Sequence, residues 1–183
     1  MKVVAIVGMT GAGKTEAARL FENEGFTRIR FGDVTDEEVR KQGLKLNEEN
    51  ERQVREALRK KYGMAAYAML NLSRIDLALK QAPVVVDGLY SWDEYIFLRN
   101  YYWRRFYVVA VWASPETRYA RLSHRGQRPL TEDEAASRDM AEIEEIKKSG
   151  PIAMADFTIL NESTLDSLKK EVKKTIAVVR RKD

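Results

Sequence analysis

The chain has 183 residues, of which 44% are hydrophobic and 33% charged, and this balance predicts a single globular domain with a core of its own. No apolar run reaches the length of a membrane span, and the run at 3–7 is too short for a signal peptide. We therefore expect a cytoplasmic protein without membrane attachment. The lack of cysteine excludes disulfides, thiolate catalysis and cysteine-ligated metal centres, and the single histidine excludes His-rich metal sites.

A phosphate-binding loop lies near the start of the chain. Residues 8–15 match the pattern G-x-x-x-x-G-K-[ST], after a β-branched run at 3–7 and before helix formers at 16–21. The glycines let the backbone wrap around phosphates with its N–H groups pointing inward, and the helix start adds its positive dipole end. The loop predicts the binding of a nucleoside triphosphate, with ATP as the default over GTP because no guanine-specifying motif stands out. The predicted binding residues are Gly8, Met9, Thr10, Gly11, Ala12, Gly13, Lys14, Thr15 and Glu16.

The segment after this loop is predicted to hold one strand and several helices. Alternation at 26–31 predicts a second strand, which ends at Gly32 and Asp33. A charged helical region is expected to open at 36–38. Residues 47–80 are strongly helical, and their first part is so polar that it predicts a helix projecting from the core, with a break at 62–63.

Two residues are candidate ligands for Mg²⁺. The Thr15 hydroxyl would take one position of the ion, while Lys14 would neutralise the β- and γ-phosphate oxygens and act in catalysis. Asp87 follows the apolar triplet 84–86 within a third predicted strand at 83–88, as in a Walker B strand whose carboxylate holds Mg²⁺ directly or through water. An aspartate after a strand is commonly only a turn former, but the phosphate-binding loop favours the metal-binding interpretation.

The second half continues the alternation of strands and helices. Ser91 and Glu94 predict a capping box before an aromatic-rich helix, whose surplus aromatic side chains fit either core packing or a homodimer face. Later elements are a strand at 106–112, a helix from Ser114-Pro115, a capping box of Thr131 and Glu134 on a helix to about Lys148, a strand at 155–161, and a helix from about Thr164 with the stripe Leu165, Leu168, Val172, Ile176 and Val179. This order predicts a parallel sheet covered on both faces.

A cluster of arginines follows the fourth strand. Arg121, Arg125 and Arg128 lie between two predicted helices, and Arg138 lies one helix further on. Most such arginines are solvated on helix surfaces. However, the tight segment 125–129 can fold over the phosphate-binding loop, and arginine donors there would stabilise the charge that develops in phosphoryl transfer. We therefore expect a catalytic role for at least one of Arg121, Arg125 and Arg128.

The chain resembles the P-loop nucleoside monophosphate kinase superfamily, and in particular dephospho-CoA-kinase-like and adenylate-kinase-related proteins. The resemblance rests on residues 8–15, 32–34, 58–63, 86–88, 114–118 with 121–122, 125–126, 138–139, and 155–156 with Asn161. It implies a three-layer α/β/α fold with a five-stranded parallel sheet of order 2-3-1-4-5. It also implies one domain with core 1–33, 81–120 and 150–183, an acceptor-binding insert at about 34–80 and a lid at about 121–138. The acceptor would lie near Asp33, which could orient or deprotonate its hydroxyl.

Two departures from the family concern the acceptor. Relatives often carry an arginine three residues after the Gly-Asp aspartate, where this chain has Asp36, and another shortly after the Asp-Gly of the third strand, where it has residues 89–91. Those arginines commonly clamp the acceptor phosphate, so their absence disfavours AMP-like acceptors. Candidates to replace these clamp arginines are Arg40, Arg55, Arg59 and Arg74. Tyr90 could instead stack on a base or contact a less charged acceptor. The candidate acceptor-binding residues are Asp33, Arg40, Arg59, Gly88, Tyr90 and Arg138.

Two functional hypotheses follow from the sequence. The first is an ATP- and Mg²⁺-dependent kinase of a nucleotide, nucleoside or coenzyme-like small molecule. The alternative is an NTP-driven switch or assembly factor that hydrolyses slowly and acts with a protein or RNA partner. The net charge of +4 leaves a nucleic-acid partner open but does not require one, since a protein that handles anionic nucleotides also carries basic charge.

Overall fold

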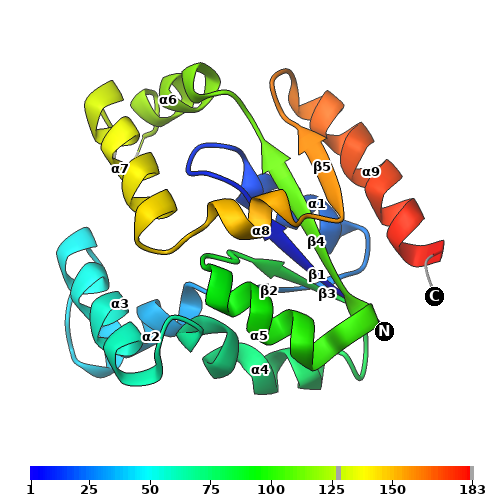
Figure 1. Ribbon diagram of the computed structural model, residues 1–183, viewed down its shortest axis with the longest axis horizontal. Helices are drawn as coiled ribbons and strands as arrows, with labels where there is room; N and C mark the ends of the chain where they lie inside the picture. The colour runs from blue at the N-terminus through cyan, green and yellow to red at the C-terminus, as the bar shows by residue number, and fades with distance from the viewer. Residues whose placement is uncertain (127–128, 182–183) are drawn as a thin grey trace.

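Five parallel strands form one sheet in the order β2-β3-β1-β4-β5, which confirms the predicted topology (Figure 1). The computed structural model describes residues 1–126 and 129–181. The strands are β1 (Val3–Val7), β2 (Thr27–Arg30), β3 (Val84–Asp87), β4 (Phe106–Trp112) and β5 (Phe157–Leu160). The central strand β1 pairs with β3 and β4, and all its residues are buried, as its continuous apolar sequence requires.

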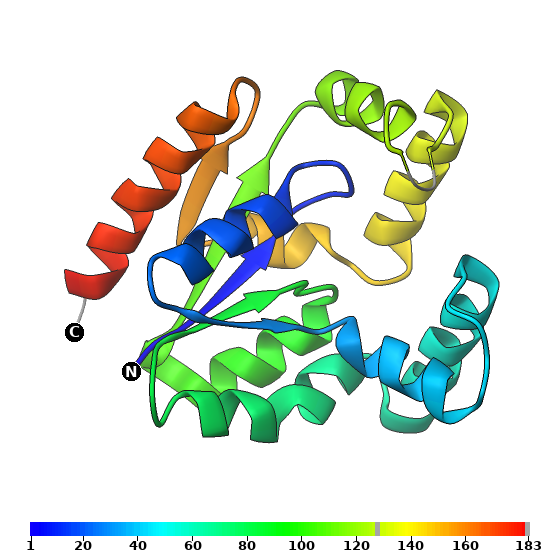
Figure 2. The ribbon, with the colours of Figure 1, turned by 180° about the vertical axis from the view of Figure 1, so that it is seen from behind.

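Side chains alternate between the two faces of the sheet and form two core clusters. Val3 and Ala5 belong to one cluster, together with side chains from α4 (Ala66–Ala78) and α5 (Trp92–Tyr102). Val4 and Ile6 belong to the other, together with α1 (Lys14–Asn23) and α9 (Leu165–Arg181). Figure 2 shows α1 and α9 in front of the sheet, with α4 and α5 low on the other side. The predicted double coverage is therefore present.

The helix starts follow the capping signals of the sequence. The capping boxes of Ser91 with Glu94 and of Thr131 with Glu134 are both formed, and they open α5 and α7 (Glu132–Glu144). α6 (Pro115–Ser123) begins with the predicted Ser114 cap and Pro115. These local hydrogen bonds fix where the chain turns back toward the sheet.

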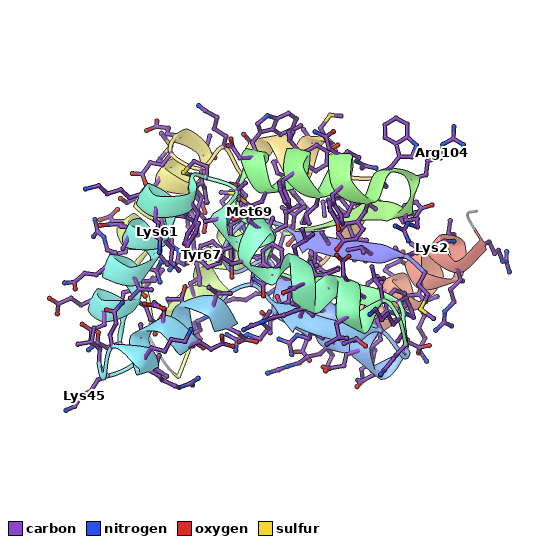
Figure 3. All side chains as sticks on the ribbon, turned by 90° about the horizontal axis from the view of Figure 1, so that it is seen from below. Lys2, Lys45, Lys61, Tyr67, Met69 and Arg104 are labelled. Atoms are coloured by element: carbon purple, nitrogen blue, oxygen red, sulfur yellow. The ribbon has the colours of Figure 1, made fainter. Side chains whose placement is uncertain are left out.

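The helices α2 (Asp33–Lys41) and α3 (Glu48–Tyr62) stand away from the sheet, and for α3 the polar sequence predicted this. Figure 3 shows Lys45, between these helices, at the far tip of the molecule from Arg104, which lies in the 3₁₀ turn η1 (Trp103–Arg105) after α5. Tyr67 lies where α4 meets them, and its hydroxyl is 2.6 Å from Thr35 Oγ1 on α2. Figures 1 and 2 show α2 and α3 on one side of the carboxyl ends of the strands, and α6 and α7 on the opposite side.

Three sequence-based predictions are wrong, two on helix boundaries and one on burial. α2 begins at Asp33 rather than at 36–38. The helix expected to reach about Lys148 ends at Glu144, the chain turns at Lys147 with a φ of 52°, and the short helix α8 (Ser149–Ala153) follows. Leu165 is not part of the buried stripe of α9: it is 48% exposed in the first turn, whereas Leu168, Val172, Ile176 and Val179 are buried.

The aromatic helix α5 divides its rings between core and surface. Tyr95 and Tyr102 are buried, while Tyr101 is 51% exposed and Trp103, just after the helix, is 66% exposed. Core packing is thus confirmed for part of the set, and a homodimer face stays a prediction. Within residues 1–126 and 129–181, no helix is both long enough and apolar enough to cross a bilayer.

Candidate functional site

The phosphate-binding loop runs from the end of β1 into α1 and packs closely against its neighbours. Gly8 and Gly13 have φ values of 153° and 97°. A Cβ on Gly8 would lie 2.3 Å from the Val111 carbonyl oxygen, and one on Gly13 would lie 2.3 Å from Asn161 Nδ2. Asn161 also donates to the Ala12 carbonyl at 2.8 Å. The loop is therefore a backbone cradle that any side chain at these two positions would fill, which fits the binding of phosphates.

Lys14, Thr15 and Asp87 lie together beside this cradle. Lys14 Nζ donates to the Met9 carbonyl at 2.9 Å, and burial, followed by the positive charge of Lys148, lowers the pKa of Lys14 to about 7. Thr15 Oγ1 lies 3.5 Å from Asp87 Oδ1. These two oxygens suit a hard cation, and Mg²⁺ takes its other ligands mainly from phosphate oxygens and water.

Asp87 has a second partner that the sequence did not indicate. Arg28 on β2 holds its carboxylate, with Nη2 2.5 Å from Oδ2, and lies 3.8 Å from Glu22 on α1. Among the described residues, no group of three histidine or acidic side chains could hold a metal ion by itself. The residues present thus fit a cation that is shared with a nucleotide rather than a protein-only metal site.

The predicted arginines of 121–138 have different surroundings. Arg121 Nη2 donates to the Asn161 carbonyl at 2.8 Å, and its Nη1 is buried without a hydrogen-bond partner in the described part of the chain. Arg125 is exposed just after α6, and Arg128 lies outside the described residues. Arg138 Nε lies 3.7 Å from Oε1 of Glu142, which contacts the phosphate-binding loop at Thr10, and its role in acceptor binding stays a prediction.

Arg118 was not predicted as a site residue, and it organises this side of the site. It is buried on α6 and makes a bidentate pair with Asp139 of α7, at 2.8 and 2.6 Å. Its other contacts are the carbonyl oxygens of Thr10 and Ala113, each at 3.1 Å. One side chain therefore ties both helices to the phosphate-binding loop.

A buried charge cluster on the α7–α8 segment was also missed. Glu142 accepts hydrogen bonds from the Thr10 hydroxyl at 2.6 Å and the Thr10 N–H at 3.3 Å. Lys148 is 2% exposed, and its Nζ lies 2.8 Å from Glu142 Oε1. Burial by itself would raise the pKa of Glu142, but the charges of Lys148 and Lys14 lower it to about 2. Glu142 is therefore a carboxylate in the folded protein.

Part of the predicted acceptor set gathers where β2 and β3 end. The Tyr90 ring folds over Gly88, and its hydroxyl also approaches Gly32, next to Asp33. Arg59 on α3 lies over the ring of Tyr67, whose centroid is 5.7 Å from that of Tyr90. Asp33 pairs with Arg30 at 2.9 Å. Arg40 is exposed in the last turn of α2.

Two buried polar atoms in this region have no hydrogen-bond partner among the described residues, Arg59 Nε and Glu94 Oε1. Burial raises the pKa of Glu94 to about 7, although its other oxygen accepts from the Tyr90 and Ser91 N–H groups. Unsatisfied buried polar atoms are costly, so the region is suited to a ligand with both donor and acceptor groups.

The raised pKa of Glu94 gives a testable pH dependence. A carboxyl whose folded-state pKa lies above the unfolded value of 4.5 favours folding in its protonated form, so this contribution is lost as the pH rises toward 7. Glu94→Gln is therefore expected to gain stability relative to the wild type between pH 5 and pH 8, by up to about 3 kcal/mol. Urea unfolding at both pH values measures this, with the exposed Glu144→Gln as control. If the free energy of unfolding changes equally between pH 5 and pH 8 in the wild type, Glu94→Gln and Glu144→Gln, the raised pKa of Glu94 is contradicted.

Comparisons by sequence show which known proteins the chain is similar to. Residues 4–146 match the family described as an AAA domain. A UPF0200 protein of Thermococcus gammatolerans is 35% identical over 175 residues, which span 93% of this chain and 92% of the relative.

Solved structures of small-molecule kinases share the fold. A gluconokinase from Sinorhizobium meliloti has a TM-score of 0.61 at 16% identity, covering 97% of this chain and 93% of that one. A shikimate kinase from Acinetobacter baumannii, solved with shikimate, has a TM-score of 0.58 at 18% identity, covering 98% and 93%. The chain belongs to the AAA-domain family and to the UPF0200 proteins, and it has the phosphate-binding loop of P-loop NTPases.

Proposed function

We propose that the protein is an ATP- and Mg²⁺-dependent phosphotransferase acting on a nucleotide, nucleoside or coenzyme-like small molecule. One observation carries this proposal. A phosphate-binding cradle with Lys14 and the Thr15–Asp87 pair stands at the carboxyl edge of the sheet. The neighbouring edge holds a second polar region with the unpartnered atoms of Arg59 and Glu94. A hydrolase needs only the first region, whereas a transferase needs both.

On the donor side, the loop backbone from Gly8 to Thr15 would bind the phosphates, and Lys14 would neutralise their oxygens. Thr15 and Asp87 would hold Mg²⁺. Mg-ATP, when bound, supplies the phosphoryl group and the counter-charge of the metal. Arg121, whose buried Nη1 has no hydrogen-bond partner among the described residues, and Arg125 would add positive charge from the lid at about 121–138.

On the acceptor side, the insert at about 34–80 would close over the second region. Asp33 is half-exposed beside Arg30 and would orient the acceptor hydroxyl or take its proton. Arg59 and Tyr90 would contact the body of the acceptor. With Asp36 and residues 89–91 in place of the usual clamp arginines, the acceptor is expected to carry no terminal phosphate in the AMP position.

A test is acceptor-stimulated ADP formation from Mg-ATP, measured over a panel of nucleoside monophosphates, nucleosides and dephospho-CoA, with gluconate and shikimate added because they suit the structural neighbours. The proposal predicts strong stimulation by one acceptor class and a product heavier by one phosphate. Slow ADP formation that ignores the entire panel would contradict it.

The lid arginines give a further expected result. Of Arg121→Ala and Arg125→Ala, at least one should lower kcat about tenfold or more while changing the dissociation constant of ATP less than about threefold, because lid donors act on charge that develops during transfer. Single-turnover rates and calorimetric binding separate the two effects. Arg19→Ala, in an exposed pair with Glu16, is the matched control. Equal losses in binding and turnover would assign both lid residues to ground-state binding.

A second candidate is a slow NTP-hydrolysing switch or assembly factor with a protein or RNA partner. The exposed Tyr101 and Trp103 favour it, as aromatic residues are enriched in interfaces. This function predicts hydrolysis that small acceptors leave unchanged and a macromolecule accelerates.

A further inference from the structure

We propose that Lys148 binds the γ-phosphate of the nucleotide. Until the nucleotide binds, the Glu142 carboxylate occupies the position of that phosphate on Thr10 and Lys148. This inference deepens the proposed function and rests on it. It adds two residues to the donor site, one of which competes with the ligand. Neither residue belongs to the phosphate-binding loop or to the arginine cluster.

The first observation is that a protein carboxylate is bound to the phosphate-binding loop. Both Glu142 oxygens are engaged there, one by the Thr10 hydroxyl at 2.6 Å and the other by the Thr10 N–H at 3.3 Å. Backbone N–H groups of such a loop are donors for anions, and carboxylate and phosphate oxygens accept similar hydrogen bonds. Glu142 therefore uses donors that a phosphate would also use.

The second observation is the excess of positive charge at this point. Lys148 lies 2.8 Å and Arg138 3.7 Å from the same Glu142 oxygen. Lys14 is close enough for its charge and that of Lys148 to influence each other. Among the described residues, Lys14, Lys148 and Arg138 thus lie around Glu142, while Asp87, which also attracts Lys14, is paired with Arg28, and the pKa of Glu94, which lies near Lys148, is raised. The surplus suits a ligand of higher negative charge than Glu142, such as a terminal phosphate.

The third observation is the burial of Lys148. It is 2% exposed, with Nζ 5.8 Å from the centre of the Tyr90 ring, which lies in the acceptor region. Burying an ion pair contributes little to stability, because desolvation offsets the attraction. Its position between Thr10 on the donor side and Tyr90 on the acceptor side is where a transferred phosphoryl group must pass. A lysine at this position can stabilise the negative charge on the phosphoryl group during its transfer.

The Arg118–Asp139 pair shows how the exchange can occur without unfolding the lid. Asp139, three residues before Glu142, holds α7 to Arg118 of α6, and Arg118 in turn donates to the Thr10 carbonyl. The helix can stay in place while the Glu142 side chain turns away, because only side-chain torsions need to change. Lys148, on the connection after α7, would then transfer its hydrogen bond from the carboxylate to a phosphate oxygen.

The experiment compares dissociation constants of Mg-ATP and Mg-ADP by calorimetry in four variants. Lys148→Met should weaken ATP binding by about tenfold or more and leave ADP binding within about threefold, because ADP lacks the γ-phosphate. Glu142→Gln should change ATP binding in the opposite direction, tightening it by about tenfold, because a competing anion is lost. The exposed Lys147→Met and Glu144→Gln are the matched controls and should keep the wild-type ATP-to-ADP ratio.

Lys148→Met leaves Glu142 buried without its main partner and could fail to fold, so Glu142→Gln/Lys148→Met serves as a second variant without the buried charges. Compared with Glu142→Gln alone, it should bind ATP about tenfold more weakly and ADP equally well, because only Lys148 differs between the two. An ATP-to-ADP ratio that is unchanged in Glu142→Gln, and equal in Glu142→Gln and the double variant, would overturn the inference and leave the pair a structural salt bridge. If the wild type itself shows no Lys14-dependent ATP binding, the proposed function fails instead, so the two failures are distinguishable.

Discussion

Lys14→Ala is expected to lower ATP-dependent turnover by about 1000-fold, the upper end of the effect of removing one charged donor from a transition state. The reason is the position of Lys14 at the junction of the phosphate-binding loop and α1, where its ammonium group is enclosed with the Thr15–Asp87 pair. We expect the nearby Lys148 not to replace it, because Lys148 lies on the connection after α7 and not on the phosphate-binding loop.

The same variant should fold normally. Lys14 Nζ donates a hydrogen bond to the Met9 carbonyl, and the loss of one such bond lowers the free energy of unfolding by about 1 kcal/mol. Thermal unfolding of Lys14→Ala beside the exposed-site control Lys147→Ala measures this. Turnover that survives in a folded Lys14→Ala protein would contradict the assignment of the donor site, whereas loss of folding would show a structural role for Lys14.

Arg118→Met is expected to destabilise the protein by about 3–5 kcal/mol, because, among the described residues, it leaves the buried Asp139 carboxylate with the Tyr119 hydroxyl as its one remaining side-chain partner. It also removes donors from the Thr10 and Ala113 carbonyls. For a chain of this size the midpoint of thermal unfolding should fall by about 10 °C. The guanidinium thus holds together the loop, α6 and α7.

Two variants make this result specific. Arg118→Met/Asp139→Asn removes both charges and should recover part of the lost stability, because no unpaired carboxylate remains. Arg19→Met breaks an exposed pair with Glu16 and should change the free energy of unfolding by less than about 1 kcal/mol. If Arg118→Met is as mild as Arg19→Met, the buried pair does not organise the lid side of the site.

The sequence predicts the sheet and most helix starts because their signals are local. The apolar run at 106–112 coincides with β4, and the capping boxes at Ser91 and Thr131 are formed, since each depends on residues within one turn. The strand order followed from the family resemblance, and the structure confirms it. The phosphate-binding loop is equally local, because its function lies in the backbone that its glycines permit.

The charge network around the loop could not be predicted, because it depends on contacts between distant residues. Lys147 and Lys148 are adjacent and chemically identical, yet one is exposed and the other buried against Glu142. The positive φ of Lys147 turns the chain there, and no turn-forming residue marks the position. Arg118 of α6 and Asp139 of α7 are likewise 21 residues apart, and no local signal in the sequence indicates that they pair. The predicted roles of Asp33, Arg40, Arg59 and Arg128 stay predictions.

The central claim is that the γ-phosphate is transferred to a small acceptor rather than to water. The most direct measurement follows the phosphorus of Mg-ATP by ³¹P NMR in the presence of the acceptor that best stimulates ADP formation, with Lys14→Ala as blank. The proposed function predicts that most of the γ-phosphate appears as a phosphoester of the acceptor and little as inorganic phosphate. Inorganic phosphate as the sole product with every acceptor of the panel, formed in a Lys14-dependent reaction, would contradict the claim and favour the NTP-hydrolysing switch.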